Sequence, residues 1–286
     1  MDEQQFRRLL EQEGLSNRTI EAFRRLVYDV YDREQRSDLP WRLTRDPYRI
    51  MVSEIMLQQT QVPRVRTRYD EFLAAFPDVG VLAVAPLNEV LAAWQGLGYN
   101  RRGMALKRAA EVIVTQHGGC VPEEVCELRT LPGIGPYTAG AIAAFAFNRP
   151  EVFIETNIRT VFLHLFFHDR HGIPDREILP LVDATLDLSM PREWYYALMD
   201  YGVKIKRETD NPGRRSSHHV RQTPFRGSNR EVRSGIIKAI LTQGSCTLRG
   251  LIAGLGGDEE RVKKNLGDLE REGFIVRTGG RYLIRD

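Results

Sequence analysis

The chain has 286 residues, of which 42% are hydrophobic and 28% charged, a balance typical of folded domains and unlike that of a disordered chain. No apolar run reaches the roughly 18 residues that a membrane-spanning helix needs, so we expect no membrane contact. The net charge of +3 is small, and the charged N-terminus has no targeting pattern. Both features favour a cytoplasmic location, nucleoid-associated in a bacterium or an archaeon.

The three cysteines, Cys120, Cys126 and Cys246, are too few and too scattered for a disulfide framework. No CxxC pair occurs, so neither a zinc site nor a four-cysteine cluster can be built from cysteine alone. His218 and His219 have no thiolate or carboxylate close by, and adjacent histidines of this kind are usually solvated. We therefore expect no metal and no cofactor.

Apolar residues recur at helical spacing almost everywhere from Phe6 to Val203, and prolines or glycines separate the periodic segments. The alternation typical of strands is nearly absent there. We expect residues 1–208 to form an all-α domain.

Composition changes at 209–228, where breakers are frequent and apolar residues few, and we place a basic linker there. From Lys206 to Arg233 there are eight Lys or Arg residues against three acids, which suits either a polyanion or a solvated linker. Arg214 and Arg215 in this stretch are candidate DNA contacts.

Residues 229–286 have a pattern of a different kind. Amphipathic helices are expected at 230–241, 248–255 and 258–272, followed by a hairpin around the Gly279-Gly280 pair. Three helices and a two-stranded wing describe a winged helix-turn-helix, a fold that binds DNA more often than it pairs proteins. The third helix carries four basic and six acidic residues, which makes it a poor reader of the major groove.

The segment Leu131–Gly140 precedes and opens a very apolar helix. Its glycines remove side chains where the chain turns and expose backbone N–H groups at a helix N-terminus, an arrangement that receives a phosphate. The string LPGIGPYT is a helix-hairpin-helix signature, and an ordinary tight turn is the alternative. The candidate contacts to a DNA backbone, which position a duplex without reading its sequence, are Leu131, Gly133, Ile134 and Gly135.

Two carboxylates stand out by their surroundings. Glu54 lies in an otherwise apolar and neutral helix, where a carboxylate is costly unless it is paired or used. Partial burial would raise its pKa and let it hold a proton near neutral pH, as a general acid requires. Glu155 follows an apolar run and precedes Thr156 and Asn157. Taken alone, Glu54 could be an exposed helix residue and Glu155 a helix N-cap or a loop acid.

From Leu39 to about Gly202 the chain resembles the adenine DNA glycosylases (MutY-like) of the helix-hairpin-helix superfamily. Four strings carry the resemblance in order: RDPYRIMVSEIMLQQTQV, LAAWQGLGYNRRGMALKRAA, LPGIGPYTAGAIAAFAF and ALMDYG. It implies a mainly α fold, with a two-lobed helix-hairpin-helix glycosylase domain in which Glu54 and the hairpin face one cleft. It also implies that Glu54 is the general acid, which protonates a flipped adenine at N7 and so makes it a good leaving group.

The family's second carboxylate is an aspartate in a DGN-like string, and an ungapped count from Leu131 places Glu155 at its position. By resemblance Glu155 stabilises the oxocarbenium-like sugar and helps water attack it, and Asn157 is retained as the third residue of the string. The longer acid and Thr156 in place of glycine depart from the pattern and bear on the attack geometry.

Tyr137 stands where bifunctional relatives similar to endonuclease III have a lysine that attacks the sugar. A phenol cannot form the imine that this attack produces. By resemblance Tyr137 would instead orient Glu155 or line the base pocket, which predicts a monofunctional enzyme.

In this family, the segments that hold Gln58, Gln59, Thr60 and Tyr99 wedge into the duplex and fill the space that a flipped base leaves. Such a plug offsets the stacking energy lost on flipping. Core packing is an alternative for Tyr99, and a solvated surface is one for the glutamines.

The chain departs from most of the family in two places. Relatives carry four cysteines for an iron–sulfur cluster after the ALMDYG-like string, whereas Lys206 stands at the first of these positions and 207–228 contain no cysteine. Arginines of the linker would take over the electrostatic role of the cluster loop. The sequence after the linker does not resemble the family's C-terminal domain, which recognises 8-oxoguanine, and we expect a winged helix in its place.

These patterns predict a monomeric, monofunctional DNA glycosylase of base excision repair, whose partner is double-stranded DNA with a mismatched or damaged base. Adenine opposite 8-oxoguanine or guanine is the first target. Thymine or uracil opposite guanine is the alternative, because mismatch-specific thymine glycosylases of the superfamily combine a similar glutamate with a tyrosine at position 137. A catalytically silent DNA-binding regulator is the alternative of another class. We expect the winged helix to add sequence-independent affinity, or to contact the base opposite the target.

Overall fold

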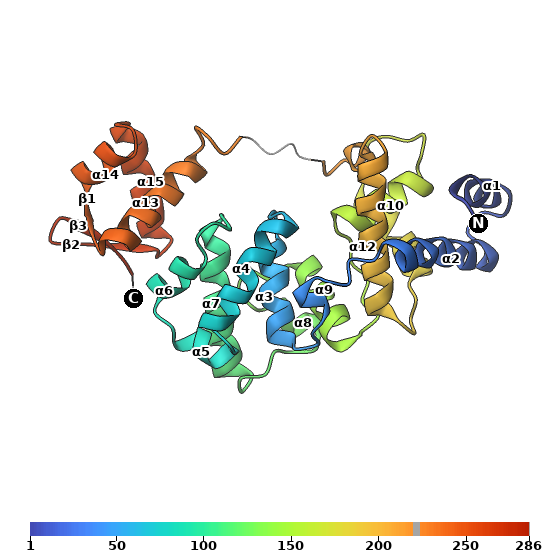
Figure 1. Ribbon diagram of the computed structural model, residues 1–286, viewed down its shortest axis with the longest axis horizontal. Helices are drawn as coiled ribbons and strands as arrows, with labels where there is room; N and C mark the ends of the chain where they lie inside the picture. The colour runs from blue at the N-terminus through green and yellow to red at the C-terminus, as the bar shows by residue number, and fades with distance from the viewer. Residues whose placement is uncertain (220–223, 286) are drawn as a thin grey trace. The chain divides into compact units, whose positions relative to one another are not determined.

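The structure is a computed structural model that describes residues 1–219 and 224–285. It is built mainly of α-helices, with a small antiparallel sheet near the C-terminus (Figure 1), as the periodicity predicts. None of the described helices is long and apolar enough to span a membrane. The elements are α1 (Glu3–Glu13), α2 (Asn17–Glu34), η1 (Pro40–Arg42), α3 (Pro47–Leu57), α4 (Val62–Ala75), α5 (Val79–Val84), α6 (Leu87–Ala93), α7 (Asn100–Gln116), α8 (Val125–Leu128), α9 (Pro136–Phe147), α10 (Thr156–Leu165), α11 (Asp175–Thr185), α12 (Pro191–Glu208), η2 (Pro212–Arg215), α13 (Asn229–Gln243), β1 (Cys246–Thr247), α14 (Leu248–Gly254), α15 (Glu259–Arg271), β2 (Ile275–Thr278) and β3 (Arg281–Ile284).

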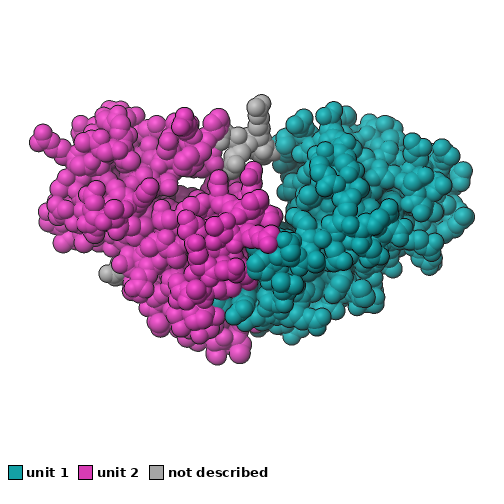
Figure 2. Space-filling model, viewed as in Figure 1, with its two compact units in different colours: residues 1–50, 123–129, 134–221 teal, residues 51–122, 130–133, 222–286 magenta. Residues whose placement is uncertain are grey.

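The chain folds into two compact units, each made of several stretches of sequence (Figure 2). Unit 1 consists of residues 1–50, 123–129 and 134–221, and unit 2 of residues 51–122, 130–133 and 222–286. Spatial contacts define these units, whereas the predicted boundaries at 208 and 228 divide the sequence into consecutive segments. Those boundaries stay a prediction.

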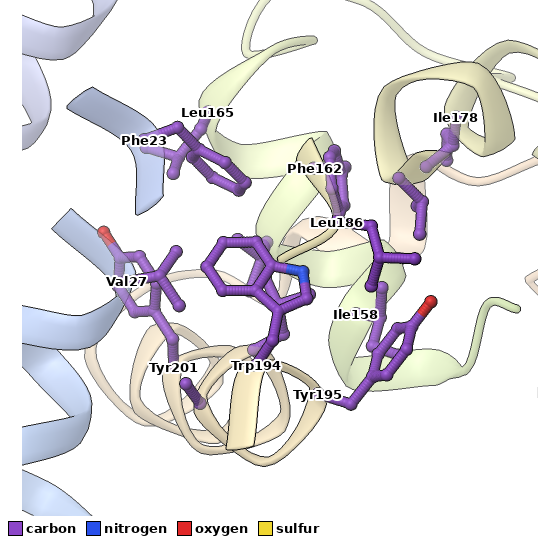
Figure 3. Packing of buried hydrophobic residues seen from close by; sticks show 14 of the residues in the cluster. Phe23, Val27, Ile158, Phe162, Leu165, Ile178, Leu186, Trp194, Tyr195 and Tyr201 are labelled. Carbon is purple, nitrogen blue, oxygen red and sulfur yellow. The ribbon is translucent and has the colours of Figure 1, made fainter. Parts of the chain in front are cut away.

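An aromatic-rich core holds unit 1 together (Figure 3). Phe23 of α2 is fully buried, and its ring centroid lies 5.4 Å from that of Phe162 in α10 and 5.7 Å from that of Trp194 in α12. Burial of a large apolar side chain contributes about 1.5–3 kcal/mol. The helix α9 is buried along Thr138–Phe145 because it is apolar on every side, as a helix with no polar face must be.

Part of the predicted linker packs against unit 1. Asn211 Oδ1 accepts the backbone N–H of Gly213 at 3.0 Å and so begins η2. The Arg215 guanidinium donates to the carbonyl oxygens of Leu163 and Phe167, both at 2.9 Å, at the C-terminal end of α10. These bonds satisfy carbonyls that a helix end leaves unpaired, which fixes a segment with few apolar residues. Residues 220–223, among them Arg221 of the predicted linker, lie outside the described part of the chain.

Residues 229–285 form a small group of three helices and a sheet with strand order β1-β3-β2. The helices begin and end within two residues of the predicted positions. Gly279 and Gly280 both have positive φ, 57° and 78°, and form the two-residue turn between β2 and β3. The third strand, β1, was not predicted because two residues carry no alternation. The order of elements is the one expected of a winged helix.

This C-terminal group is packed onto other helices of unit 2. Leu87 and Leu91 of α6 and Met104 of α7 share one apolar core with α13. Glu272 accepts hydrogen bonds from Arg101 on α7 (2.8 Å) and from Arg233 on α13 (2.5 Å). A shared core and a shared carboxylate attach the C-terminal group directly to the rest of the unit.

Candidate active site

Glu54 lies near the end of α3 in unit 2, and its side chain is held away from solvent. Only 4% of the residue is exposed, and its neighbours Ser53, Ile55 and Met56 are at most 1% exposed. No other acid occurs in this helix. The alternative in which Glu54 is an exposed helix residue is therefore excluded.

Two loops of unit 2 contain strained backbone. Gln59, after α3, has φ of 55°, and Tyr99, before α7, has φ of 48°. The left-handed conformation costs a residue with a β-carbon about 1–2 kcal/mol. Thr60 Oγ1 donates to the carbonyl oxygen of Leu97 at 3.3 Å and so joins the loops. Tyr99 is half-buried. Strained residues of this kind cluster at functional sites.

Arg102, in the first turn of α7, donates hydrogen bonds to the end of α3 and to the two loops that hold Gln59 and Tyr99. Burial lowers the pKa of its guanidinium to about 10, which leaves the cation intact at neutral pH. It donates to Thr60 Oγ1 (2.9 Å) and to the carbonyl oxygens of Ile55 (3.0 Å), Met56 (2.9 Å), Gln58, Leu97 (3.1 Å) and Gly98 (3.1 Å). The sequence did not single out Arg102. A base in the first turn of a helix, where the dipole favours an acid, was the available signal.

The predicted hairpin has buried aliphatic residues and exposed glycines. Leu131 and Ile134 are 2% and 5% exposed, whereas Gly133 and Gly135 are exposed. Gly133 has φ of +80°, and a β-carbon there would lie 2.7 Å from Ala105 Cβ. Gly135 is the N-cap of α9, with Pro136 in the first turn. The side chains of Leu131 and Ile134 thus anchor the turn, and the glycine backbone is presented to solvent. In addition, Gln58 Nε2 donates to the carbonyl oxygen of Gly133 at 3.3 Å.

Glu155 is the N-cap of α10 in unit 1. Its Oε1 accepts the backbone N–H groups of Asn157 (2.6 Å) and Ile158 (2.9 Å), and its Oε2 accepts Asn157 Nδ2 at 3.3 Å. Burial raises the pKa of Glu155, while the hydrogen bond from Ile158 and the charge of Lys206 oppose that rise. The local role is the N-cap that the sequence offered as an alternative. An anion at a helix N-terminus also keeps its charge favourably placed, so the cap does not preclude chemistry.

Tyr137 lies in the first turn of α9, half-buried against the residues that lead to Glu155. Its ring centroid is 5.8 Å from that of Phe153, which stacks on Tyr195 at 3.9 Å. A β-carbon at Gly140, further along α9, would lie 3.0 Å from the Phe153 ring. The absence of a side chain at Gly140 lets α9 approach this segment and brings Tyr137 beside it.

Unit 2 contains a pocket of about 790 Å³ beside the two strained loops. Gln59 and Tyr99 line it together with residues of α13 and α15. Arg230 of α13 donates to Tyr99 Oη at 2.8 Å, and its guanidinium lies 5.5 Å from the centre of the Tyr99 ring. The charged residues that line the pocket are Arg64, Arg101, Arg230, Arg233 and Asp268. The excess of arginine over acid suits an anionic polymer.

Residues 52–183 match the HhH-GPD superfamily of base excision DNA repair proteins. This match covers a little under half of the chain. The chain is similar to the adenine DNA glycosylase of Mycolicibacterium smegmatis, with 44% identity over 61% of this chain and 60% of the relative. The adenine DNA glycosylases of Buchnera aphidicola and Homo sapiens are 34% and 35% identical over 65% of the chain, which corresponds to 54% and 36% of those proteins. The chain thus spans about a third to three fifths of the length of these relatives.

Solved structures with the same fold include a thermostable thymine-DNA glycosylase, 26% identical, with a TM-score of 0.59 over 65% of this chain and 87% of that one. An endonuclease III trapped as a covalent intermediate with DNA has a TM-score of 0.52 and is 18% identical, over 79% of this chain and 91% of that one. The second similarity concerns the HhH-GPD fold alone.

The iron–sulfur cluster that the sequence resemblance implies does not fit the residues of this chain. Lys206, at the first expected cysteine position, is an ammonium on α12 that hydrogen-bonds Asn157. Cys120 and Cys126, which precede Leu131–Gly135 in the sequence, are exposed to solvent, and Cys246 is buried in the C-terminal group. Within residues 1–219 and 224–285, no group of three or more His, Cys, Asp or Glu is placed to hold a metal ion.

The two predicted DNA-binding arginines of the linker differ in what they contact. Arg214 is exposed and keeps its predicted role as a candidate. The guanidinium of Arg215 donates to carbonyl oxygens that end α10, and its role as a DNA contact stays a prediction. Burial lowers the pKa of Arg215 without removing its charge from the helix end, where a cation is favourable. Arg215 therefore holds the segment in place.

Proposed function

We propose that the protein is a monofunctional DNA glycosylase of base excision repair that removes a mispaired adenine from duplex DNA by hydrolysis. The observation that carries the proposal is Glu54, a solvent-excluded acid in an apolar helix. It lies inside the segment that matches the HhH-GPD superfamily and the three adenine DNA glycosylases.

In this reaction Glu54 donates its proton to N7 of the adenine. The bond between adenine N9 and the sugar C1′ then breaks, and the bonding electrons leave with the base. Glu155, held at a helix N-terminus, stabilises the positive charge that develops on the sugar. Water adds to C1′ and its proton passes to a carboxylate. Two carboxylates in different environments can divide the tasks in this way, because one holds a proton and the other stays anionic.

The side chain at position 137 supports hydrolysis rather than attack by an amine. Tyr137 carries no amino group, so it cannot form an imine with C1′ and cleave the strand. Its place beside Phe153 suits contact with the base or with the segment of Glu155.

We further propose that unit 2 engages the duplex around the extruded base. The exposed backbone of the hairpin receives a phosphate, and Gln59 and Tyr99 fill the gap that the base leaves. The arginine-lined pocket beside them then receives the strand opposite the target, with the C-terminal group as its second wall. In this arrangement the C-terminal group contacts the opposite base and adds affinity without reading a sequence.

The test is single-turnover excision on duplexes that carry adenine, thymine, uracil or hypoxanthine opposite guanine or 8-oxoguanine, with strand scission by hot alkali as the readout. We expect adenine opposite 8-oxoguanine or guanine to be excised fastest. Glu54→Gln should bind the same duplex as well as the parent and lose at least about 10²-fold in rate, the scale of a lost general acid. Glu71→Gln, an exposed acid of α4 in unit 2, is the matched control and should keep the full rate.

Three results would contradict parts of this proposal. Faster excision of thymine or uracil than of adenine would favour the thymine alternative, which the 26% identical thymine-DNA glycosylase keeps open. Tight binding without excision of any base would identify a catalytically silent DNA-binding protein. A covalent adduct trapped by borohydride would mean that a lysine attacks the sugar, and the enzyme would not be monofunctional.

A further inference from the structure

The helix α12 lies against the N-terminus of α10 with no room for a side chain between them. A β-carbon at Gly202 would lie 2.3 Å from the carbonyl oxygen of Asn157 and 2.7 Å from its Cβ. Backbone cannot move aside as a flexible side chain can, so only glycine permits this approach. The contact sets the distance from α12 to the residues beside Glu155.

One turn further along α12, Lys206 reaches the side chain of the same asparagine. Its Nζ donates to Asn157 Oδ1 at 2.8 Å, and the lysine is partly buried. The other end of the asparagine amide, Nδ2, donates to Glu155 Oε2 at 3.3 Å. An ammonium can only donate and a carboxylate can only accept. The amide is therefore held in one orientation, with its oxygen toward Lys206 and its nitrogen toward Glu155.

We propose that Lys206 is a positioning residue of the excision reaction, which acts through the Asn157 amide to hold the Glu155 carboxylate oriented and anionic. This inference rests on the proposed function, because it requires that Glu155 stabilise the sugar cation. It gives a task in the site to the position at which related proteins hold the first ligand of their cluster.

The charges around Glu155 support this assignment. Lys206 on α12 and Arg159 on α10 are the cations that favour its anionic form, against the effect of burial. Arg159 is itself paired with Asp175 of α11 through two bonds of 2.7 Å, which largely neutralises it. Lys206 has no carboxylate within salt-bridge distance among the described residues. Burial lowers the pKa of Lys206 and the charge of Glu155 opposes that shift, so Lys206 contributes a positive charge near Glu155 that no salt bridge among the described residues neutralises.

Loss of the ammonium has a defined consequence for the pH dependence. Without Lys206, the amide of Asn157 keeps its bond to Glu155 but loses the partner of its oxygen, and the anionic form of Glu155 loses a favourable charge. The pKa of Glu155 then rises further above its ordinary value. Because the reaction uses the anion, the acidic limb of the excision rate should move to higher pH, while the alkaline limb, set by another group, should stay.

The experiment compares Lys206→Met, Lys206→Arg and Lys204→Met in the full chain. Lys204 is the matched control, two residues away on α12 in a surface pair with Glu34 and Glu208. The readouts are the single-turnover rate between pH 5 and pH 9, the Kd for the duplex and the melting temperature. We expect Lys206→Met to lose on the order of tenfold in rate at neutral pH, the effect of a mispositioned reacting group. The acidic limb of its pH profile should move to higher pH. Lys206→Arg should restore most of the rate and most of the position of the acidic limb, and Lys204→Met should match the parent.

A double-mutant cycle with Asn157→Leu tests whether Lys206 acts through the amide. The effects of Lys206→Met and Asn157→Leu should not add, because either change breaks the same connection to Glu155. Additive effects would overturn the connection. An unmoved acidic limb in folded Lys206→Met would also overturn the inference, and a change in Kd alone would make Lys206 a phosphate contact.

Failure of the inference is distinguishable from failure of the proposed function. If the parent excises a base and Glu155→Gln does not, an unchanged pH profile in Lys206→Met counts against Lys206 alone. If Glu155→Gln keeps the parent rate, the assigned role of Glu155 is wrong and the inference falls with it. If the parent excises no base from any duplex, the proposed function itself is wrong.

Discussion

Unit 1 holds a buried carboxylate, Asp200, and a half-buried one, Glu155, and their surroundings differ. Asp200 of α12 accepts two hydrogen bonds from Arg42, at 2.7 and 2.9 Å, and two from Arg36, at 2.5 and 3.0 Å. Although burial alone would raise it, the bonds and charges of Arg42 and Arg36 hold the pKa of Asp200 below its ordinary value. Glu155 accepts N–H groups and has Lys206 and Arg159 as more distant cations, and burial raises its pKa.

The difference separates a carboxylate that fixes the fold from one that can take part in a reaction. Guanidinium groups bonded directly to Asp200 leave it no capacity for a further partner, so it ties η1 to α12. Glu155 is held in place by a helix N-terminus that compensates its charge only in part. A positive charge developing on a bound sugar would therefore find an incompletely neutralised anion at Glu155 and none at Asp200.

The largest effect on stability is expected when the structural carboxylate, Asp200, is replaced. Asp200→Asn should lower the free energy of unfolding by about 3–5 kcal/mol, because it leaves two arginines without their buried counter-charge. Urea unfolding followed by circular dichroism measures the change. Asp32→Asn, an exposed acid of α2, should leave stability within about 0.5 kcal/mol. A small loss in Asp200→Asn would mean that this cluster does not hold unit 1 together.

The next effect comes from the approach of α12 to α10. Gly202→Ala should cost about 1–3 kcal/mol of stability, since the new β-carbon forces the backbone of Asn157 aside. The excision rate should fall further than the stability loss explains, because Glu155 moves with Asn157. Gly267→Ala is the matched control, on an open face of α15, and should gain up to about 1 kcal/mol. Equal behaviour of the two variants would remove the close approach as a requirement.

A smaller effect on stability is expected at the other carboxylate. Glu155→Gln keeps an oxygen that can cap α10 and removes an anion that burial disfavours. Its melting temperature at pH 8 should equal or exceed that of the parent, while excision is lost. Glu21→Gln on the exposed part of α2 should change neither quantity. A marked fall in melting temperature would make Glu155 primarily a structural cap.

The smallest effect is a difference between Asp200 and Glu155 in how their contributions to stability change with pH. The pKa of Asp200 is lowered on folding, so its contribution to stability is present above about pH 4 and is lost as the pH falls. The pKa of Glu155 is raised, so the native state binds its proton more tightly and loses stability as the pH rises from about 4. Relative to the parent, Asp200→Asn should thus recover toward acid pH, and Glu155→Gln should gain toward neutral pH. Parallel unfolding curves for both variants from pH 3 to pH 8 would contradict these opposite slopes.

Local patterns were sufficient to predict several features. The all-α character follows from apolar periodicity, and the two glycines at 279 and 280 predicted a turn that only positive φ permits. The hairpin glycines, the apolar helix around Glu54 and the C-terminal helices are also local features, because each depends on residues a few positions apart. These predictions needed no knowledge of which distant segments meet.

Other features depend on contacts between residues far apart in the sequence. Arg102 donates hydrogen bonds to carbonyl oxygens of α3, more than forty positions earlier in the sequence. The residues next to Arg102 in the sequence do not predict these bonds. The sequence around Arg215 predicts a solvated linker, whereas in the structure Arg215 donates a hydrogen bond to a carbonyl oxygen near the end of α10.

The sequence by itself determined the helical class and the glycine-containing turn at 131–135. It also singled out Glu54 and Glu155 as candidate acids and showed that position 137 holds no lysine. Only the tertiary structure decided that Glu54 is buried, that Lys206 joins Glu155 through Asn157, and that the C-terminal group shares a core with α6 and α7. The physical reason is that propensity and periodicity are fixed by neighbours in the chain. Burial and charge compensation are instead fixed by whatever other segments bring to the same place.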